Sequence, residues 1–144
     1  MKKILIVNAN YYEDISKNLI IGAEKKLKKY KTSLKIINVP GVFEVPFTIK
    51  KYIKKFDGFL ALGCVIKGET PHFDFICKST FDAIINLTIN HNKPIGNGII
   101  TSINMDQALK RSAVVKSNYK LKPNKGFEAA NALISIFNNE PKNK

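Results

Sequence analysis

Apolar residues along this chain follow two different spacings, which alternate from one end to the other. Short runs rich in apolar residues occupy positions 3–7, 34–39, 60–66 and 95–100, and the run at 60–66 is broken only by Gly63. A continuous apolar run of this length is typical of a strand that is buried on both faces of a parallel sheet. The pattern therefore predicts four strands.

Between and after these runs, apolar residues recur at helical spacing. Helices are expected over residues 15–30, from Pro46 to about 56, from after 75 to about 90, over 105–111, and after Gly126 to about 136. Asp14 or Ser16 is available to cap the first helix, and Pro46 is tolerated in a first helical turn. Strands that alternate with helices imply right-handed crossovers. The predicted fold class is α/β, a three-layer α/β/α sandwich with a four-stranded parallel sheet.

The composition fits one domain in a reducing compartment. No linker, repeat or low-complexity segment divides residues 1–144, which are numerous enough to bury one core without disulfides or a metal. The two cysteines, Cys64 and Cys77, show no Cys-x-x-Cys spacing and are expected to be reduced, buried packing residues. The first apolar run is too short for a signal peptide and no stretch could span a membrane, which favours the cytoplasm.

The positive charge would by itself suggest nucleic-acid binding, since the formal net charge is +13. The lysines, however, are spread over the polar sides of expected helices, and no Arg-rich segment or basic-aromatic motif accompanies them. Solvated helix faces explain this pattern better than nucleic acid does. Arg111 is the single arginine among 24 basic residues. Its planar guanidinium suits a phosphate, although a chance survivor in a lysine-rich composition is the alternative.

Residues 63–75 join the end of the third strand to a cluster of polar side chains. Glu69, Thr70, His72 and Asp74 stand in the loop between this strand and the next helix. Ligands of parallel α/β sheets bind outside the carboxyl ends of strands, and the helix that follows offers free N–H groups to an anion. Because histidine is well suited to moving protons near neutral pH, His72 is the candidate proton carrier.

A simpler interpretation makes the same loop a helix start, with Thr70 as the cap and Pro71 at the first helical position. That interpretation leaves His72 without a role. His91 is expected on the surface at the far end of the helix, too distant from His72 and Asp74 for a shared metal site. No nucleophilic triad, P-loop or Gly-x-Gly-x-x-Gly motif is present.

The other strand-end loops also carry side chains suited to binding. Tyr11 follows the first strand, and Phe43 and Glu44 follow the second. The carboxyl ends of parallel strands lie at one edge, so a flat heterocycle is expected to stack there while Glu44 hydrogen-bonds its edge or a polyol. The alternatives are ordinary packing for Phe43 and a half-exposed surface position for Tyr11.

Six short motifs occur in order over nearly the whole chain. They are Asn10-Tyr11, Pro40-Gly41-Val42-Phe43-Glu44, Gly63 through Asp74, Asn97-Gly98-Ile99-Ile100-Thr101, Asp106-Gln107-Ala108-Leu109-Lys110-Arg111, and Asn124-Lys125-Gly126-Phe127-Glu128-Ala129-Ala130. In this ordered set the chain resembles the 6,7-dimethyl-8-ribityllumazine synthase family. The resemblance implies a flavodoxin-like fold and a transferase of riboflavin biosynthesis.

The implied reaction condenses 5-amino-6-(D-ribitylamino)uracil with 3,4-dihydroxy-2-butanone 4-phosphate and releases phosphate and water. The implied partners are these small-molecule substrates, and no cofactor, metal, nucleic acid or membrane is implied. An amine attacks a ketone to form an imine, phosphate is eliminated, and a second amine closes the ring. Every step needs proton transfer, and binding both substrates in register supplies a large proximity effect.

The family's site residues, carried to matching positions, form three groups. His72 is implied to be the catalytic proton shuttle. The phosphate is implied to contact the backbone of Gly68, Glu69 and Thr70 together with Arg111. The pyrimidine and ribityl group are implied to contact Tyr11, Val42, Phe43, Glu44, Cys64, Val65, Ile66, Asn97 and Lys125.

Some positions depart from the family's usual pattern. Lys67 stands where many members have arginine, Asn97 exchanges a stacking aromatic for a hydrogen-bonding edge, and a longer segment, 112–124, precedes Lys125. The chain also lacks the N-terminal extension that adds a strand to a neighbour in many members. The family implies a ring of five subunits with sites between neighbours. The segment near Lys122 and Pro123 favours a homopentamer or paired pentamers over an icosahedral shell.

Two other functions stay open. An archaeal-type riboflavin synthase resembles this family in fold but dismutates two lumazines without butanone phosphate. A non-catalytic binder of flavin or nucleic acid is the other alternative, although a binder has little reason to keep His72, Arg111 and Lys125 together. The main interpretation also implies a functional link to riboflavin synthase.

Overall fold

A computed structural model describes residues 1–114 and 124–141 of the chain. The strands are β1 (Lys2–Ala9), β2 (Thr32–Val39), β3 (Gly58–Ile66) and β4 (Ile95–Ser102). They form one parallel sheet in the order β2-β1-β3-β4. The helices are α1 (Glu13–Leu27), α2 (Val45–Lys51), α3 (His72–His91), α4 (Met105–Arg111) and α5 (Lys125–Asn138), and a short 3-10 turn, η1 (Val42–Glu44), precedes α2.

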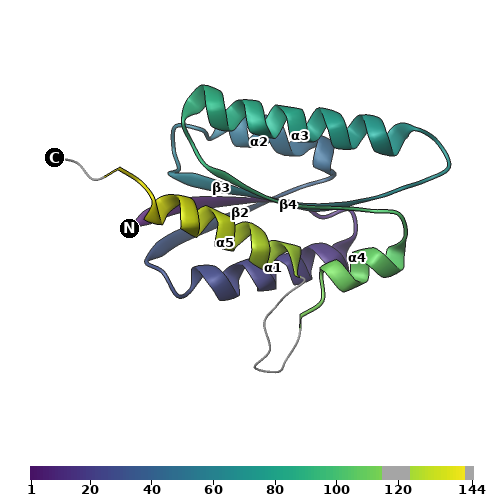
Figure 1. The fold of residues 1–144 in the computed structure, drawn as a ribbon, viewed down its shortest axis with the longest axis horizontal. Helices are drawn as coiled ribbons and strands as arrows, with labels where there is room; N and C mark the ends of the chain where they lie inside the picture. Colours follow the sequence, from purple (N-terminus) through teal and green to yellow (C-terminus); the bar gives the residue numbers. More distant parts are fainter. Residues whose placement is uncertain (115–123, 142–144) are drawn as a thin grey trace.

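The helices cover both faces of the sheet, so the predicted three-layer α/β/α class is confirmed. α2 and α3 lie over one face, and α1, α4 and α5 lie over the other (Figure 1). Two buried clusters match these layers. One packs Leu60 and Leu62 of β3 against α1 and α5, and the other packs Phe59 and Ala61 against α2 and α3.

The continuous apolar run predicted for β3 is buried on both faces because β3 lies in the middle of the sheet. Residues 58–64 of this strand are all buried, and residues 4–9 of its neighbour β1 are buried as well. β2 lies at one edge, and in that strand Val39 is the one residue that is fully buried. The two-sided burial expected from the sequence therefore applies to the central strands rather than to β2.

α3 begins earlier than the sequence pattern predicts, because its first hydrogen bonds start at Pro71. The N–H groups of Asp74 and Phe75 both donate to the Pro71 carbonyl oxygen, at 3.1 and 3.3 Å. Pro71 therefore stands just before the helix and not at its first position, and His72 is the first helical residue. The expected Thr70 cap is wrong, since Pro71 occupies the cap position without a side-chain cap hydrogen bond, and Thr70 Oγ1 only accepts from the His72 N–H at 3.4 Å.

Two other helix boundaries also differ from expectation. α1 begins at Glu13, so Asp14 and Ser16 lie inside its first turn, and Tyr12 at the cap position makes no side-chain cap hydrogen bond. Ser16 instead donates through Oγ to the Glu13 carbonyl oxygen at 3.0 Å. α2 ends at Lys51 rather than near residue 56.

α1 and α5 approach each other closely at two glycines, and this contact positions the start of α5. A Cβ added to Gly126 would overlap the Leu19 carbonyl oxygen, and one added to Gly22 would overlap the side chain of Asn124. Neither position leaves room for a side chain. The backbone of α5 is therefore held against α1 at the residues on either side of Lys125.

Candidate functional site

The strand order reverses between β1 and β3, and a cavity of about 340 Å³ lies at this point. Loops that leave neighbouring strands for opposite faces of a parallel sheet open a crevice there, which is where such folds bind ligands. The walls come from the ends of β1, β2 and β3 and from the first turns of α3. We call it the aromatic cavity, and it is lined by Tyr11, Tyr12, Gly41, Val42, Phe43, Cys64, Val65, Ile66, His72 and Ile76.

Exposed aromatic rings surround the mouth of the aromatic cavity. Tyr11 is 74% exposed and Phe43 is 62% exposed, although large aromatic side chains are usually buried to a greater extent. Tyr11 packs edge-to-face on Tyr12, with ring centroids 4.9 Å apart. Because Tyr11 and Phe43 line the same cavity, a chance surface position for Tyr11 and ordinary packing for Phe43 explain them less well. The rings can close over a flat ligand.

His72 lies on the wall of the same cavity, at the N-terminus of the 20-residue helix α3. Its imidazole is exposed, so solvent and a bound molecule can both reach it. Gly68, Glu69 and Thr70 precede it in the exposed loop after β3 and are not among the residues that line the cavity. Glu44 is half-buried at the end of η1 and also stays outside the lining, although its neighbour Phe43 belongs to it.

Cys64 forms part of the buried floor of the aromatic cavity. Burial raises the pKa of its thiol to about 11, and a hydrogen bond with the Ser102 side chain acts in the opposite direction. The thiolate is the nucleophilic form of cysteine, so Cys64 is a packing residue at neutral pH, as predicted. Cys77 is half-buried rather than buried, so that part of the expectation is wrong, although Cys77 lies on the same face of α3 as the buried Thr80 and Ile84.

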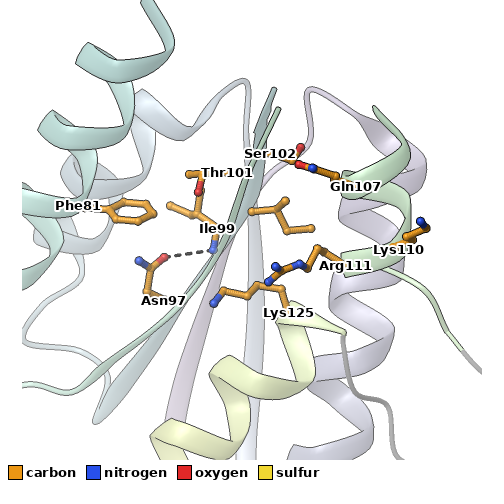
Figure 2. A pocket seen from close by; sticks show the side chains of 10 residues that line it. Phe81, Asn97, Ile99, Thr101, Ser102, Gln107, Lys110, Arg111 and Lys125 are labelled. Atoms are coloured by element: carbon orange, nitrogen blue, oxygen red, sulfur yellow. Dashed lines mark hydrogen bonds between the residues drawn. The ribbon is translucent and has the colours of Figure 1, made fainter. Parts of the chain in front are cut away.

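A second cavity, of about 500 Å³, lies along the outer edge of β4 (Figure 2). Its polar walls come from β4, α4 and the first residue of α5, and one aromatic wall comes from α3. We call it the cationic cavity. It is lined by Phe81, Asn97, Ile99, Ile100, Thr101, Ser102, Gln107, Lys110, Arg111 and Lys125.

Arg111 and Lys125 bring two positive charges to the cationic cavity from different helices. Arg111 is the last residue of α4 and Lys125 is the first residue of α5, and both head groups extend toward the edge of β4 in Figure 2. The Lys125 ammonium also lies 3.6 Å from Glu128 Oε2. Lys110 points away from them and pairs with Asp106 at 3.1 Å. Arg111 and Lys125 together can hold an anion such as a phosphate.

Residues predicted to form one site therefore lie in two cavities of the chain. Tyr11, Val42, Phe43, Cys64, Val65, Ile66 and His72 line the aromatic cavity, whereas Asn97, Arg111 and Lys125 line the cationic cavity. The residues predicted to bind the phosphate are divided too, because residues 68–70 adjoin His72 while Arg111 is at the edge of β4. Within the described residues, the two linings share no member.

Ten of the lining residues were not predicted as site residues, among them Ile76, Gln107 and Phe81. Ile76 is one helical turn after His72 and Gln107 is one turn before Arg111, so the spacing of four residues is a signal that could have identified them. Phe81 has no such spacing from a predicted site residue, and an apolar residue of a helix is ordinarily assigned to the core. Among residues 1–114 and 124–141, no three His, Cys, Asp or Glu side chains cluster as a metal site would require. Nor does any helix in those ranges have the length and apolarity to cross a membrane.

A parallel α/β sheet with a heterocycle-sized aromatic cavity and an anion-binding cavity beside its strand ends is typical of an enzyme that acts on small phosphorylated molecules. The family description "6,7-dimethyl-8-ribityllumazine synthase" matches residues 1–140. The chain belongs to this family.

Individual relatives agree with that assignment. A 6,7-dimethyl-8-ribityllumazine synthase of Campylobacter jejuni is 38% identical over 141 residues, which cover 94% of this chain and 88% of the relative. That of Limosilactobacillus reuteri is 40% identical over 119 residues, covering 81% and 78%. That of Methylorubrum populi is 36% identical over 142 residues, covering 94% and 80%.

Proposed function

We propose that this protein is a transferase of riboflavin biosynthesis that condenses 5-amino-6-(D-ribitylamino)uracil with 3,4-dihydroxy-2-butanone 4-phosphate to give 6,7-dimethyl-8-ribityllumazine, phosphate and water. The observation that carries the proposal is the pairing of His72 with exposed aromatic rings in one cavity. A reaction between two amines and a ketone needs a flat binding surface and a proton carrier beside it. The names of the relatives point to the same product.

On the pyrimidine side, Tyr11 and Phe43 stack on the heterocycle while Val42 and residues 64–66 bind its edge through side chains and backbone. Cys64 acts here as a small apolar wall, because its thiol stays protonated. Glu44 reaches the ribityl hydroxyls from outside the lining, next to Phe43. Lys125 and Asn97 contact the pyrimidine or ribityl group from the cationic cavity.

On the phosphate side, the guanidinium of Arg111 binds two phosphate oxygens, and the backbone of Gly68, Glu69 and Thr70 at the start of α3 binds the others. His72 then lies beside the carbon from which phosphate leaves, and it moves protons during imine formation and elimination. Holding the two substrates in register lowers the barrier independently of this proton transfer.

The separation of the two cavities supports a site that is shared between subunits. The aromatic cavity of one chain and the cationic cavity of its neighbour would bring His72 and the aromatic rings together with Asn97, Arg111 and Lys125, which one chain presents apart. A cyclic homopentamer, single or paired, makes this combination at each interface. Lys122 and Pro123, which were predicted to favour a pentamer over a shell, lie outside the described residues. Residues 1–144 act as one domain in this arrangement, in the cytoplasm, and the product passes to a riboflavin synthase.

The test is to incubate the purified protein with the two substrates and follow the absorbance and fluorescence of the lumazine. Formation of lumazine with stoichiometric release of phosphate is the expected result. A parallel incubation with lumazine alone detects a riboflavin synthase by the appearance of riboflavin. Salt-sensitive binding of nucleic acid without lumazine formation would contradict the proposal and favour a non-catalytic binder.

A further inference from the structure

We propose that Phe81 and Asn97 together recognise the carbonyl edge of the pyrimidine substrate, with the Phe81 ring as a stacking wall and the Asn97 amide as a hydrogen-bond donor. This inference rests on the proposed function, because it concerns how the same site selects and orients its heterocycle. It also accounts for the stacking surface that Asn97 cannot provide. The inference is supported by the residues that line the cationic cavity and by the orientation of the amide side chains among them.

Phe81 is placed to contact a ligand because β4 is an edge strand. Its neighbours on α3, Thr80 and Ile84, are buried, whereas the ring of Phe81 is half-buried. One side packs against the core cluster beneath α3, and the other lines the cationic cavity. In Figure 2 the ring stands over the edge of β4, on the opposite side of the strand from Arg111. The cavity thus has an aromatic end and a cationic end.

The amide of Asn97 is oriented by the backbone of its own strand. Asn97 Oδ1 accepts a hydrogen bond from the Ile99 N–H at 3.1 Å, which fixes the oxygen toward β4. The Nδ2 therefore points away from Ile99, as Figure 2 shows. Because an amide nitrogen can only donate, the Asn97 Nδ2 offers its hydrogens to a ligand, while one lone pair of Oδ1 is already used by the Ile99 N–H.

Gln107 shows the same arrangement on the other side of the cavity. Its Oε1 accepts from the Ile103 N–H at 2.9 Å, so its nitrogen too is the group left for a ligand. With Arg111 and Lys125, these amides give the cationic cavity four donor groups beside the hydroxyls of Thr101 and Ser102. The Asn97 and Gln107 nitrogens pair with carbonyl oxygens of a planar ring and cannot accept from its amino groups. The carbonyl edge of the pyrimidine therefore faces Asn97, and its amino groups face His72 across the interface.

The experiment compares four variants in the assembled protein. Phe81→Leu removes the ring and keeps an apolar side chain, and Phe81→Tyr keeps the ring. Asn97→Asp keeps an acceptor for the Ile99 N–H and loses the donor. The matched control is Phe56→Leu, because Phe56 is half-buried against the same core cluster but lines neither cavity. Each variant is measured for the KM of both substrates, for lumazine affinity by fluorescence titration, and for thermal unfolding.

We expect Phe81→Leu to raise the KM for the pyrimidine about 3- to 10-fold, as loss of one aromatic contact predicts. Phe81→Tyr and Phe56→Leu should leave it within about twofold, and Asn97→Asp should raise it about tenfold. If Phe81→Leu left the KM for the pyrimidine and the affinity for lumazine unchanged, the inference would be overturned. The proposed function would still stand in that case, provided that the unmodified protein forms lumazine. If the unmodified protein bound no lumazine and formed none, both would be overturned. If it bound lumazine without forming it, equal affinity in Phe81→Leu would overturn the inference separately, and a weakened affinity would support it.

Discussion

The buried side chain of Asn124 joins the start of α5 to the end of α4, because its Nδ2 donates to the Ser112 carbonyl oxygen at 3.2 Å. The same nitrogen lies 3.2 Å from the carbonyl oxygens of Asn18 and Ala113. Its Oδ1 accepts from the Phe127 N–H at 3.0 Å and so caps α5. Arg111 and Lys125 directly adjoin this junction, so Asn124 fixes the distance between the two cations.

Replacing Asn124 should therefore affect both stability and phosphate binding. Asn124→Ala removes a helix cap and leaves several buried backbone groups without a partner, which should lower the free energy of unfolding by about 2–4 kcal/mol. Urea unfolding measures this loss. Asn131→Ala, at an exposed asparagine of the same helix, is the control and should change stability by less than about 0.5 kcal/mol. Equal stability of the two variants would contradict the role given to Asn124.

Arg111→Lys should raise the KM for the butanone phosphate and leave binding of the pyrimidine nearly unchanged. Lysine keeps the charge but loses the planar pair of donors, so a bidentate contact worth about 1–2 kcal/mol should cost roughly 5- to 30-fold in KM. Steady-state kinetics with each substrate varied in turn measures the effect. Lys28→Arg, at the residue that follows α1 and outside both linings, controls for a general effect of exchanging these side chains. No change in either KM would remove Arg111 from phosphate recognition.

His72→Ala should slow turnover while the pyrimidine still binds. The exposed imidazole lines the aromatic cavity, but the rings of Tyr11 and Phe43, which we propose stack on the heterocycle, stay in place. Because proximity still operates, we expect kcat to fall about 10- to 100-fold rather than to vanish. His91→Ala, at the opposite end of α3, is the matched control. Retention of full turnover by His72→Ala would exclude a catalytic role.

The fold could be predicted from the sequence because central parallel strands leave an unmistakable apolar run, as in 60–66. Helix starts were less accurate. The first turn of α3, residues 72–75, alternates polar residues with Phe73 and Phe75, so helical spacing becomes visible only after Phe75, although the hydrogen bonds of the helix begin at Pro71. The loops with Tyr11, Phe43 and His72 could be placed at one edge of the sheet because parallel strands all end there, and their roles stay predictions.

The division of the site into two cavities could not be predicted from chain order. Sequence spacing places His72 and Arg111 at strand ends, but it does not give the distance between the crevice at β1 and β3 and the outer edge of β4. The ring of Phe81 was missed because helical periodicity assigns an apolar residue to the core side. Helical periodicity cannot show whether such a ring is covered by a strand or lies beyond the edge strand, where a ligand can reach it.

The buried thiol of Cys64 predicts a pH dependence of stability. Burial raises its pKa from 9.0 to about 11, so between these values the unfolded chain releases a proton that the folded chain retains. The stabilisation is fully present below pH 9 and is lost as the pH rises through about 11, by roughly 2–3 kcal/mol. Urea unfolding across this range should show a shallower decline for Cys64→Ala than for the unmodified protein. Parallel declines in the two proteins would contradict the assignment.

The separation of the aromatic and cationic cavities predicts that two impaired variants restore each other's activity when they assemble together. A chain with His72→Ala keeps an intact cationic cavity, and a chain with Arg111→Gln keeps an intact aromatic cavity. If each site takes one cavity from each of two neighbours in a ring, unfolding and refolding an equal mixture should make about one quarter of the sites complete. The measurement is lumazine formation per chain after co-refolding, compared with the same variants refolded apart and then mixed. Should the co-refolded sample show no more than the sum of the residual activities, each chain would have to carry its own complete site, and the distance between the two cavities would then have to close within one subunit.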